Sequence, residues 1–144
     1  MNREELKQIL PQREPMLLVD EAWKNEDGTA GGKYTVRGDE FFVQGHFPGN
    51  PVVPGVILCE MAAQCSCMLM ADKVQGRITM FTGLDKVKFK TPVRPGDTVV
   101  FKSTHLRAMS FIHKVSVVGE VNGKTAVSLE FTIALVDPSS VQNM

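Results

Sequence analysis

The chain of 144 residues carries 16 basic and 16 acidic residues, so its formal net charge at pH 7 is zero. A balanced charge gives no electrostatic reason to expect nucleic acid or an anionic membrane surface as a partner. With 43% hydrophobic and 22% charged residues, the composition is that of an ordinary globular protein, and the length suits one domain over residues 1–144. The start, MNREELKQIL, has no apolar stretch typical of a secretory signal, so we expect a cytoplasmic protein.

The first forty residues predict short elements separated by turns. Arg3 to Leu10 can form a helix that ends at Pro11. Met16 to Asp20 is a short apolar run that predicts a strand. Glu26-Asp27-Gly28 has the composition of a turn, and Gly31 to Val36 is expected to be a second strand that closes a hairpin.

Between residues 45 and 55 three glycines alternate with three prolines in the sequence GHFPGNPVVPG. Each proline fixes its own φ and drives the preceding residue toward extended geometry, here Phe47, Asn50 and Val53. Glycine adds φ values that other residues rarely adopt. We therefore expect an irregular but stiff loop that holds His46 in a fixed position.

A long apolar helix is expected to follow, beginning at Pro54, because the preset φ of proline suits the first helical position. Val53 would then be the N-cap residue, and it has no side-chain oxygen. The first amides of the helix are thus predicted to lack their usual partner and to be available to a ligand oxygen. These are the amides of Gly55, Val56 and Ile57.

From Val56 to Ala71 this helix is apolar on nearly every side, which indicates burial in a core. Glu60 is therefore expected to be a carboxyl group inside a core helix. A buried and unpaired carboxyl group tends to keep its proton, as a general acid must near neutral pH. Gln64 follows one turn later on the same face. If His46 faces Glu60 across a cavity, the site holds a base, an acid and free amides.

The apolar run from Val52 to Ala71 is long enough to raise a membrane-spanning alternative, but its polar residues and its proline-glycine start argue against that interpretation. Cys59, Cys65 and Cys67 all fall in this run. Because one helix cannot bring cysteines at such spacing into a metal or disulfide geometry, we expect them to be small buried hydrophobic side chains and expect no metal site there.

The second half of the chain predicts an antiparallel sheet. Asn122-Gly123 is a strong signal for a type I′ hairpin. One buried helix against long strands indicates an α+β fold, and the tail from Pro138 to Met144 is expected to be loose. The predicted strands are Ile78–Thr82, Asp97–Leu106, Phe111–Val121 and Lys124–Val136.

The segment around His46 resembles the active-site segment of the 3-hydroxyacyl-(acyl-carrier-protein) dehydratases of type II fatty acid synthesis, the FabZ-like group. The matching residues are His46 to Pro51 (HFPGNP), residues 54–56 (PGV) and Glu60, fourteen positions after the histidine. Residues 10–20 and 83–97 are similar to the same family, except that Gln12 stands where relatives usually have a histidine, which is not catalytic in the family. Relatives that also isomerise the double bond typically carry aspartate in place of Glu60, so the resemblance favours the dehydratase branch.

This resemblance implies a hot-dog fold, in which a curved antiparallel sheet wraps around one long central helix. It implies that His46 removes the C2 proton of the substrate and that Glu60 protonates the departing C3 hydroxyl. The amides of Gly55 and Val56 would bind the thioester carbonyl, while Gln64 would hold the carboxyl group or the water. No metal or redox cofactor is expected, because side chains supply the acid and the base.

The resemblance also implies partners. The substrate is carried by an acyl carrier protein, and each pocket contains the histidine of one subunit and the glutamate of another. We therefore expect a two-fold homodimer, commonly assembled in the family as a hexamer, a trimer of dimers. The apolar character of the strands fits an obligate interface.

Three lysines alternate with apolar residues in one predicted strand. Lys86, Lys88 and Lys90 flank Val87 and Phe89, which would place the lysines on one face and the apolar pair on the other. Such a charge pattern is most often a solvated face. Alternatively, the lysines contact the acidic carrier protein and steer its approach, together with nearby basic residues. Those residues are Arg94, Lys102 and Arg107.

Simpler interpretations of the site residues stay open. From the residues alone, His46 could be a loop histidine bonded to the backbone, and Glu60 could be a buried acid paired with Arg13 or Arg37. Gln64 and Gly55 could serve only in packing and in hydrogen bonding to backbone groups. His105 and His113 fall in predicted strands and are expected at a surface or interface, without an assigned role.

Two other functional classes also stay open. A hot-dog thioesterase would share the fold and use a helix carboxylate to activate water against the thioester. A non-catalytic acyl-carrier-binding protein could be built on the same scaffold, although the presence of both His46 and Glu60 counts against it.

Overall fold

The computed structural model describes residues 1–142, which form six strands and several short helices. The strands are β1 (Glu21–Lys24), β2 (Ala30–Thr35), β3 (Ile78–Phe89), β4 (Thr98–Met109), β5 (Ile112–Val121) and β6 (Lys124–Val136). The helices are α1 (Arg3–Leu6), α2 (Phe41–Gln44), α3 (Gly55–Cys65), the 3₁₀ helix η1 (Cys67–Met70), α4 (Ala71–Val74) and α5 (Pro138–Val141).

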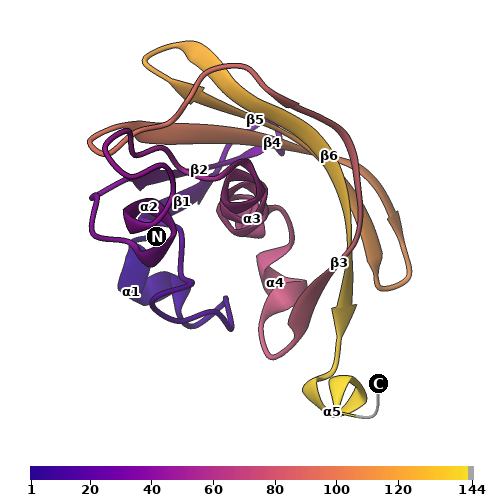
Figure 1. Cartoon of the computed structure of the whole chain (residues 1–144). Helices are drawn as coiled ribbons and strands as arrows, with labels where there is room; N and C mark the ends of the chain where they lie inside the picture. The colour runs from indigo at the N-terminus through magenta and orange to yellow at the C-terminus, as the bar shows by residue number, and fades with distance from the viewer. Residues whose placement is uncertain (143–144) are drawn as a thin grey trace.

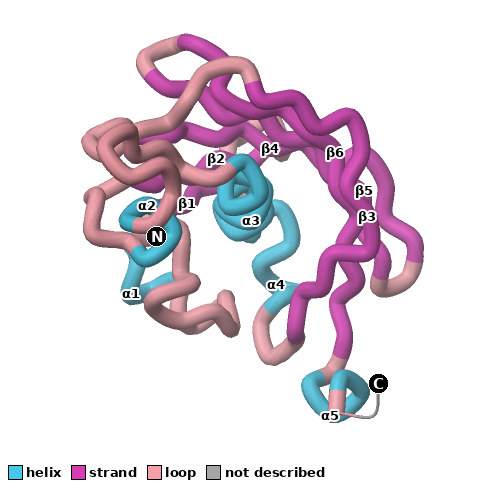
Figure 2. The backbone as a smooth tube through the Cα atoms, in the orientation of Figure 1, coloured by secondary structure: helices cyan, strands magenta, loops and turns pink. Residues whose placement is uncertain are grey.

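All six strands form one antiparallel sheet in the order β1-β2-β4-β5-β6-β3. Figure 1 shows that this sheet curves around α3, the longest helix. Figure 2 shows long irregular segments, in pink, on the side of the molecule that carries α1 and α2. This is the predicted α+β arrangement, the hot-dog fold, in which the sheet wraps around a central helix.

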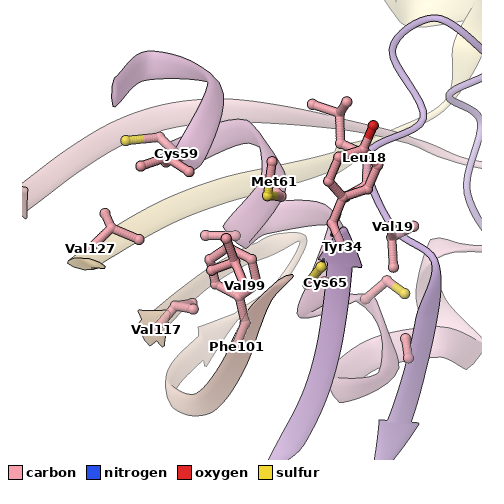
Figure 3. Close-up of a cluster of buried hydrophobic side chains, with 14 of the residues drawn as sticks. Leu18, Val19, Tyr34, Cys59, Met61, Cys65, Val99, Phe101, Val117 and Val127 are labelled. Atoms are coloured by element: carbon pink, nitrogen blue, oxygen red, sulfur yellow. Dashed lines mark hydrogen bonds between the residues drawn. The ribbon is translucent and has the colours of Figure 1, made fainter. Parts of the chain in front are cut away.

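The core lies between the concave face of the sheet and α3 (Figure 3). Met61 and Cys65 of α3 pack among strand residues such as Val99 and Phe101. Gly32 in β2 makes the close approach possible, because a Cβ atom there would lie 2.6 Å from the Cβ of Cys65. The prediction that the cysteines are buried is confirmed: Cys59, Cys65 and Cys67 are buried and free.

The central helix is shorter than predicted. The apolar run continues to Ala71, but α3 ends at Cys65, and η1 and α4 follow at an angle of 42°. Ser66 explains the break, because its Oγ donates to the carbonyl oxygen of Ala63 (2.7 Å) and competes with helical hydrogen bonds. Within residues 1–142 no single helix is long and apolar enough to cross a membrane, although this bent pair together has the length and composition of a span.

The N-terminal strand predicted at Met16 to Asp20 is wrong. Side chains bind much of its backbone: Arg3 donates to the carbonyl oxygens of Leu17 (2.7 Å) and Val19 (3.1 Å). Asp20, at its end, donates from its amide to the carbonyl oxygen of Lys33 in β2 (2.8 Å). The first strand is instead β1, which follows this segment. The first helix also ends early, at Leu6.

The C-terminal strands agree with the prediction within a few residues, and the Asn122-Gly123 turn is confirmed, with positive φ at both residues. The strand predicted at Ile78–Thr82 is longer, because β3 pairs with β6 up to Phe89. The tail was expected to be loose, but Pro138–Val141 form one helical turn. Residues 143–144 of that tail lie outside the described residues.

Candidate active site

His46 lies in the glycine- and proline-rich loop between α2 and α3, and its imidazole has one fixed hydrogen bond. The Nδ1 atom lies 3.0 Å from the carbonyl oxygen of Val52. A carbonyl can only accept, so in the neutral ring Nδ1 carries the hydrogen and Nε2 keeps a free lone pair. The loop therefore presents Nε2 as the basic atom of this histidine.

Phe47 departs from the predicted extended geometry. Its φ is +58°, a left-handed conformation that is rare for a bulky residue. This conformation lets its carbonyl oxygen accept from the amide of Asn50 (2.8 Å). It also stacks the Phe47 ring on the His46 ring, with 4.0 Å between their centroids. Such backbone strain persists only where surrounding contacts hold it.

Those contacts come from the segment before β4. The amide of Val53 donates to the carbonyl oxygen of Val93 (2.8 Å). Arg94 reaches back and donates from Nη1 to the Oδ1 of Asn50 (2.7 Å). These distant partners, together with the prolines, support the expected stiffness of the loop around His46, which stays a prediction.

The start of α3 differs from the prediction by one residue. Pro54 is the N-cap residue and Gly55 is the first helical residue. The amide of Ile57 is not free, because it donates to the carbonyl oxygen of Pro54 (3.0 Å). Within residues 1–142 the amides of Gly55 and Val56 have no acceptor. These two amides remain available to a ligand oxygen.

His46 and Gly55 border the same open hollow, which has a volume of about 430 Å³. Phe89 of β3 covers Gly55 so closely that a Cβ atom on this glycine would lie 2.9 Å from the ring. No local pattern in the sequence predicts this contact, because the two residues are far apart in the chain. A ligand oxygen at the free amides would therefore lie between the histidine loop and an aromatic ring.

Glu60 is partly buried on α3, where full burial was predicted, and it is not unpaired. Its Oε2 accepts a hydrogen bond of 2.9 Å from the Nε2 of Gln64. Among the described residues it has no ion pair, and the two arginines considered as partners bind elsewhere. Arg37 pairs with Asp20 (2.7 Å), and Arg13 donates to backbone carbonyls of the N-terminal loop.

Gln64 is buried, and three hydrogen bonds fix its side-chain amide. Its Oε1 accepts from the amide of Leu18 (2.7 Å), and its Nε2 donates to the carbonyl oxygen of Met16 (2.8 Å) and to Glu60. The backbone donor and acceptor determine which way the amide faces. Both Nε2 hydrogens are used, so Gln64 holds the carboxyl group and has no donor left for a water molecule.

Glu60 and Gln64 border a small cavity of about 30 Å³, separate from the hollow beside His46. The N-terminal loop, α3, η1, α4, β3 and β6 enclose it. Its remaining walls are mostly apolar, with Gln12 and Thr79 as the further polar residues. Within one chain, therefore, the predicted acid and the predicted base line different cavities.

The lysine pattern is interrupted. A bulge separates Asp85 from Lys88 in the pairing of β3 with β6, so the strict alternation is lost. Lys86 has φ +52° and forms an ion pair with Glu130 (3.4 Å). Lys90 borders the hollow beside His46, whereas Lys88 lies by residues of β5 and β6 on another part of the surface.

The strand histidines contact each other. The Nδ1 of His113 lies 3.0 Å from the Nε2 of His105. His113 is 1% exposed, so its expected place at a surface or interface is wrong, because it lies inside the chain's own core. Burial, followed by His105 and Lys73, lowers the pKa of His113. Across the described part of the chain, no three His, Cys, Asp or Glu side chains gather in a way that could hold a metal ion.

Comparison with known proteins gives a consistent result. Residues 10–130 match the FabA-like domain family. A protein of Macrococcus caseolyticus named 3-hydroxyacyl-(acyl-carrier-protein) dehydratase FabZ is 39% identical over 137 residues, 93% of this chain and 94% of the relative. A protein of the same name from Staphylococcus epidermidis is 40% identical over 136 residues, 92% of this chain and 94% of the relative.

A solved structure has the same fold. The dehydratase heterocomplex ApeI:P from Xenorhabdus doucetiae contains a chain that superposes with a TM-score of 0.81 at 17% identity. The superposition covers 96% of this chain and 95% of that chain. At this low identity the similarity concerns the fold alone.

Proposed function

The chain belongs to the FabA-like family, and from this premise we propose that it is a 3-hydroxyacyl-(acyl-carrier-protein) dehydratase. The reaction removes water from a (3R)-3-hydroxyacyl thioester and gives the trans-2-enoyl thioester in type II fatty acid synthesis. The observation that carries the proposal is the similarity to relatives of that name over more than nine tenths of both chains. A cytoplasmic location is part of the proposal.

His46 is the general base. Its Nδ1–H is committed to the carbonyl oxygen of Val52, so Nε2 is the atom that takes the C2 proton. The electron pair of the broken C2–H bond forms the C2–C3 double bond as the C3–O bond breaks. The stacked ring of Phe47 and the hydrogen bond to Val52 together keep the imidazole plane fixed. A fixed imidazole favours proton transfer from one carbon of the substrate, C2.

Glu60 is the general acid. Its Oε2 accepts from Gln64, so the transferable proton sits on Oε1. That proton goes to the C3 hydroxyl, which leaves as water. Gln64 is a positioning residue, because it holds the carboxyl group and ties it to the backbone at Met16 and Leu18.

The amides of Gly55 and Val56 bind the thioester carbonyl oxygen. Both amides lack an acceptor in the described structure. They lie in the first turn of α3, where the helix dipole favours negative charge. They stabilise the enolate-like charge that develops as the C2 proton leaves. The scheme needs no metal or redox cofactor, because side chains and backbone amides perform every step.

We propose further that the complete site forms between two copies of the chain. In a single chain His46 and Glu60 line separate cavities, and a shared site would join the base of one copy to the acid of the other. The strand β3 lies at an edge of the sheet, is long, and exposes Phe81, Leu84 and Phe89. An edge strand of this kind is a ready template for pairing with a second copy. A hexamer, as a trimer of such dimers, extends the same proposal.

The acyl carrier protein is the proposed partner. Arg94 and Lys86 are already engaged by Asn50 and Glu130, so Lys90 is the best placed of the predicted basic residues. It borders the hollow that holds His46, where the carrier-linked thioester would enter. Lys88 would add to the long-range attraction of an acidic carrier.

The absorbance of the enoyl thioester tests this function, measured for the wild type, His46→Ala and Glu60→Gln. Each substitution is expected to lower the rate by roughly several hundred-fold, the usual contribution of an acid or base, while the oligomer persists. Glu26→Gln, in an exposed turn, is the matched control and should keep full activity. Release of free thiol without enoyl formation would indicate a thioesterase, and carrier binding without turnover would indicate a binding protein.

A further inference from the structure

The cavity beside Glu60 contains a buried oxygen that has no partner. This atom is the Oε1 of Gln12, which has no hydrogen bond within residues 1–142 although it is shielded from solvent. Gln12 lines the same cavity as Glu60 and Gln64. Buried acceptors are nearly always satisfied in native proteins, so an unsatisfied one that borders a cavity indicates a missing donor.

The backbone that carries Gln12 is fixed from both sides. Arg13 donates from Nη1 to the carbonyl oxygens of Leu10 (2.7 Å) and Gln12 (2.8 Å). Beyond it, Gln64 binds Met16 and Leu18 of the same loop. The backbone position of Gln12 is therefore fixed by the loop itself, and its Oε1 lies shielded from solvent without a partner.

The neighbouring groups do not supply the missing donor. The hydroxyl of Thr79 and the carboxyl group of Glu60 line the same cavity, but within residues 1–142 neither forms a hydrogen bond with the Oε1 of Gln12. Both Nε2 hydrogens of Gln64 are used by Met16 and Glu60. Most other residues around the cavity are apolar, among them Leu10, Ala63 and Val74. The cavity volume is about 30 Å³, and one water molecule needs roughly 10–15 Å³ on this kind of measure. The space is therefore large enough for a hydroxyl group or a water molecule.

We propose that the Oε1 of Gln12 accepts a hydrogen bond from the C3 hydroxyl of the substrate and from the water that this hydroxyl becomes. The inference rests on the proposed dehydratase function. A hydroxyl donates through its hydrogen and accepts through its lone pairs. When its hydrogen is bound by Gln12, its lone pairs can turn toward the proton of Glu60. Gln12 thus positions the leaving group and distinguishes a 3-hydroxyacyl chain from a chain without the hydroxyl.

The test compares two ligands that differ only in this hydroxyl: a 3-hydroxyacyl thioester and the saturated acyl thioester of the same length. Binding is measured in a His46→Ala background, which prevents turnover but leaves Glu60 unchanged. Gln12→Leu is expected to weaken binding of the hydroxyacyl thioester by about tenfold, as for one lost hydrogen bond. Binding of the saturated thioester should change by less than about twofold.

Two further variants complete the experiment. Gln8→Leu, a matched change at an exposed glutamine, should leave both affinities unchanged. Gln12→His introduces a ring nitrogen that can accept a hydrogen bond, so this variant should show most of the wild-type preference for the hydroxyacyl ligand. The same variant keeps the inference testable if Gln12→Leu does not fold. Equal losses for both ligands, or no loss for either, would overturn the inference. The proposed function is judged separately, by whether the wild type forms the enoyl thioester.

Discussion

Gln64 donates a hydrogen bond of 2.9 Å to Glu60, one turn earlier on α3, and the same amide group binds the backbone of the N-terminal loop at Met16 and Leu18. One buried side chain thus connects the proposed acid to a segment more than forty residues away, since the Gln64–Leu18 bond spans 46 positions. The position of the carboxyl group therefore depends on how the N-terminal loop folds against the helix.

Gln64→Leu should destabilise the protein and lower its activity together. The substitution leaves the buried amide of Leu18 without a partner, at a cost of about 1–3 kcal/mol, and it also removes the donor to the partly exposed carbonyl oxygen of Met16. Urea unfolding should show a correspondingly lower free energy of unfolding. Gln75→Leu, at an exposed position, is the control. An unchanged urea midpoint for Gln64→Leu would show that the loop is held by other contacts.

Gly55→Ala should impair catalysis without a large loss of stability. The new Cβ would lie 2.9 Å from the Phe89 ring, and this ring is 53% exposed, so it can move away. Its movement would disturb the place proposed for the thioester carbonyl. We expect kcat/KM to fall by about tenfold or more, as when one oxyanion donor is displaced, with little change in Tm.

A second substitution checks the cause of that effect. Phe89→Leu introduced together with Gly55→Ala removes the ring that the new methyl group meets, so it should recover part of the lost kcat/KM. Phe89→Leu alone is the control. If the double variant is no better than Gly55→Ala, the ring contact is not the reason for the loss.

His113 should make the protein less stable in mild acid. Burial lowers its pKa in the folded state from the ordinary value of 6.5, and His105 and Lys73 lower it further. As the pH falls through 6.5, the unfolded chain binds the proton first, so the free energy of unfolding decreases until the lower folded pKa is passed. Above 6.5 this residue contributes no pH dependence.

Urea midpoints between about pH 7.5 and about pH 5.5 measure this effect. The variant His113→Gln should show a smaller decrease than the wild type over that range. Gln75→Leu, which changes no titratable group at an exposed position, should keep the wild-type decrease. An identical pH dependence in wild type and His113→Gln would contradict the assignment.

Local patterns in the sequence predicted the α+β architecture, and they indicated site residues whose roles stay a prediction. The apolar helix with Glu60, the hairpin at Asn122-Gly123 and the rigid loop around His46 all have short-range signals. Local patterns failed where distant side chains decide the local structure. The segment from Met16 to Asp20 is not a strand because the side chains of Arg3 and Gln64 bind its carbonyl groups and amides. The hydrophobic periodicity of the sequence does not predict such contacts.

The polar contacts of the site could not be predicted from the sequence either. The buried oxygen of Gln12 and the ring of Phe89 over Gly55 depend on segments that meet only in the folded chain. Relatives in the resembling family usually have histidine at the position of Gln12, and this difference was the one sign of that residue in the sequence. The left-handed backbone of Phe47 opposes the preference of a residue before proline, so propensity alone predicts the wrong geometry there.

The central claim is that one site combines His46 of one copy with Glu60 of another. The most direct measurement mixes two inactive variants, His46→Ala and Glu60→Gln, by unfolding and refolding them together, and follows enoyl formation. Random pairing makes about half of the dimers mixed, and each mixed dimer has one intact site of two, so about a quarter of wild-type activity should return. If the mixture stays as inactive as either variant alone while mixed dimers are present, the shared site is contradicted.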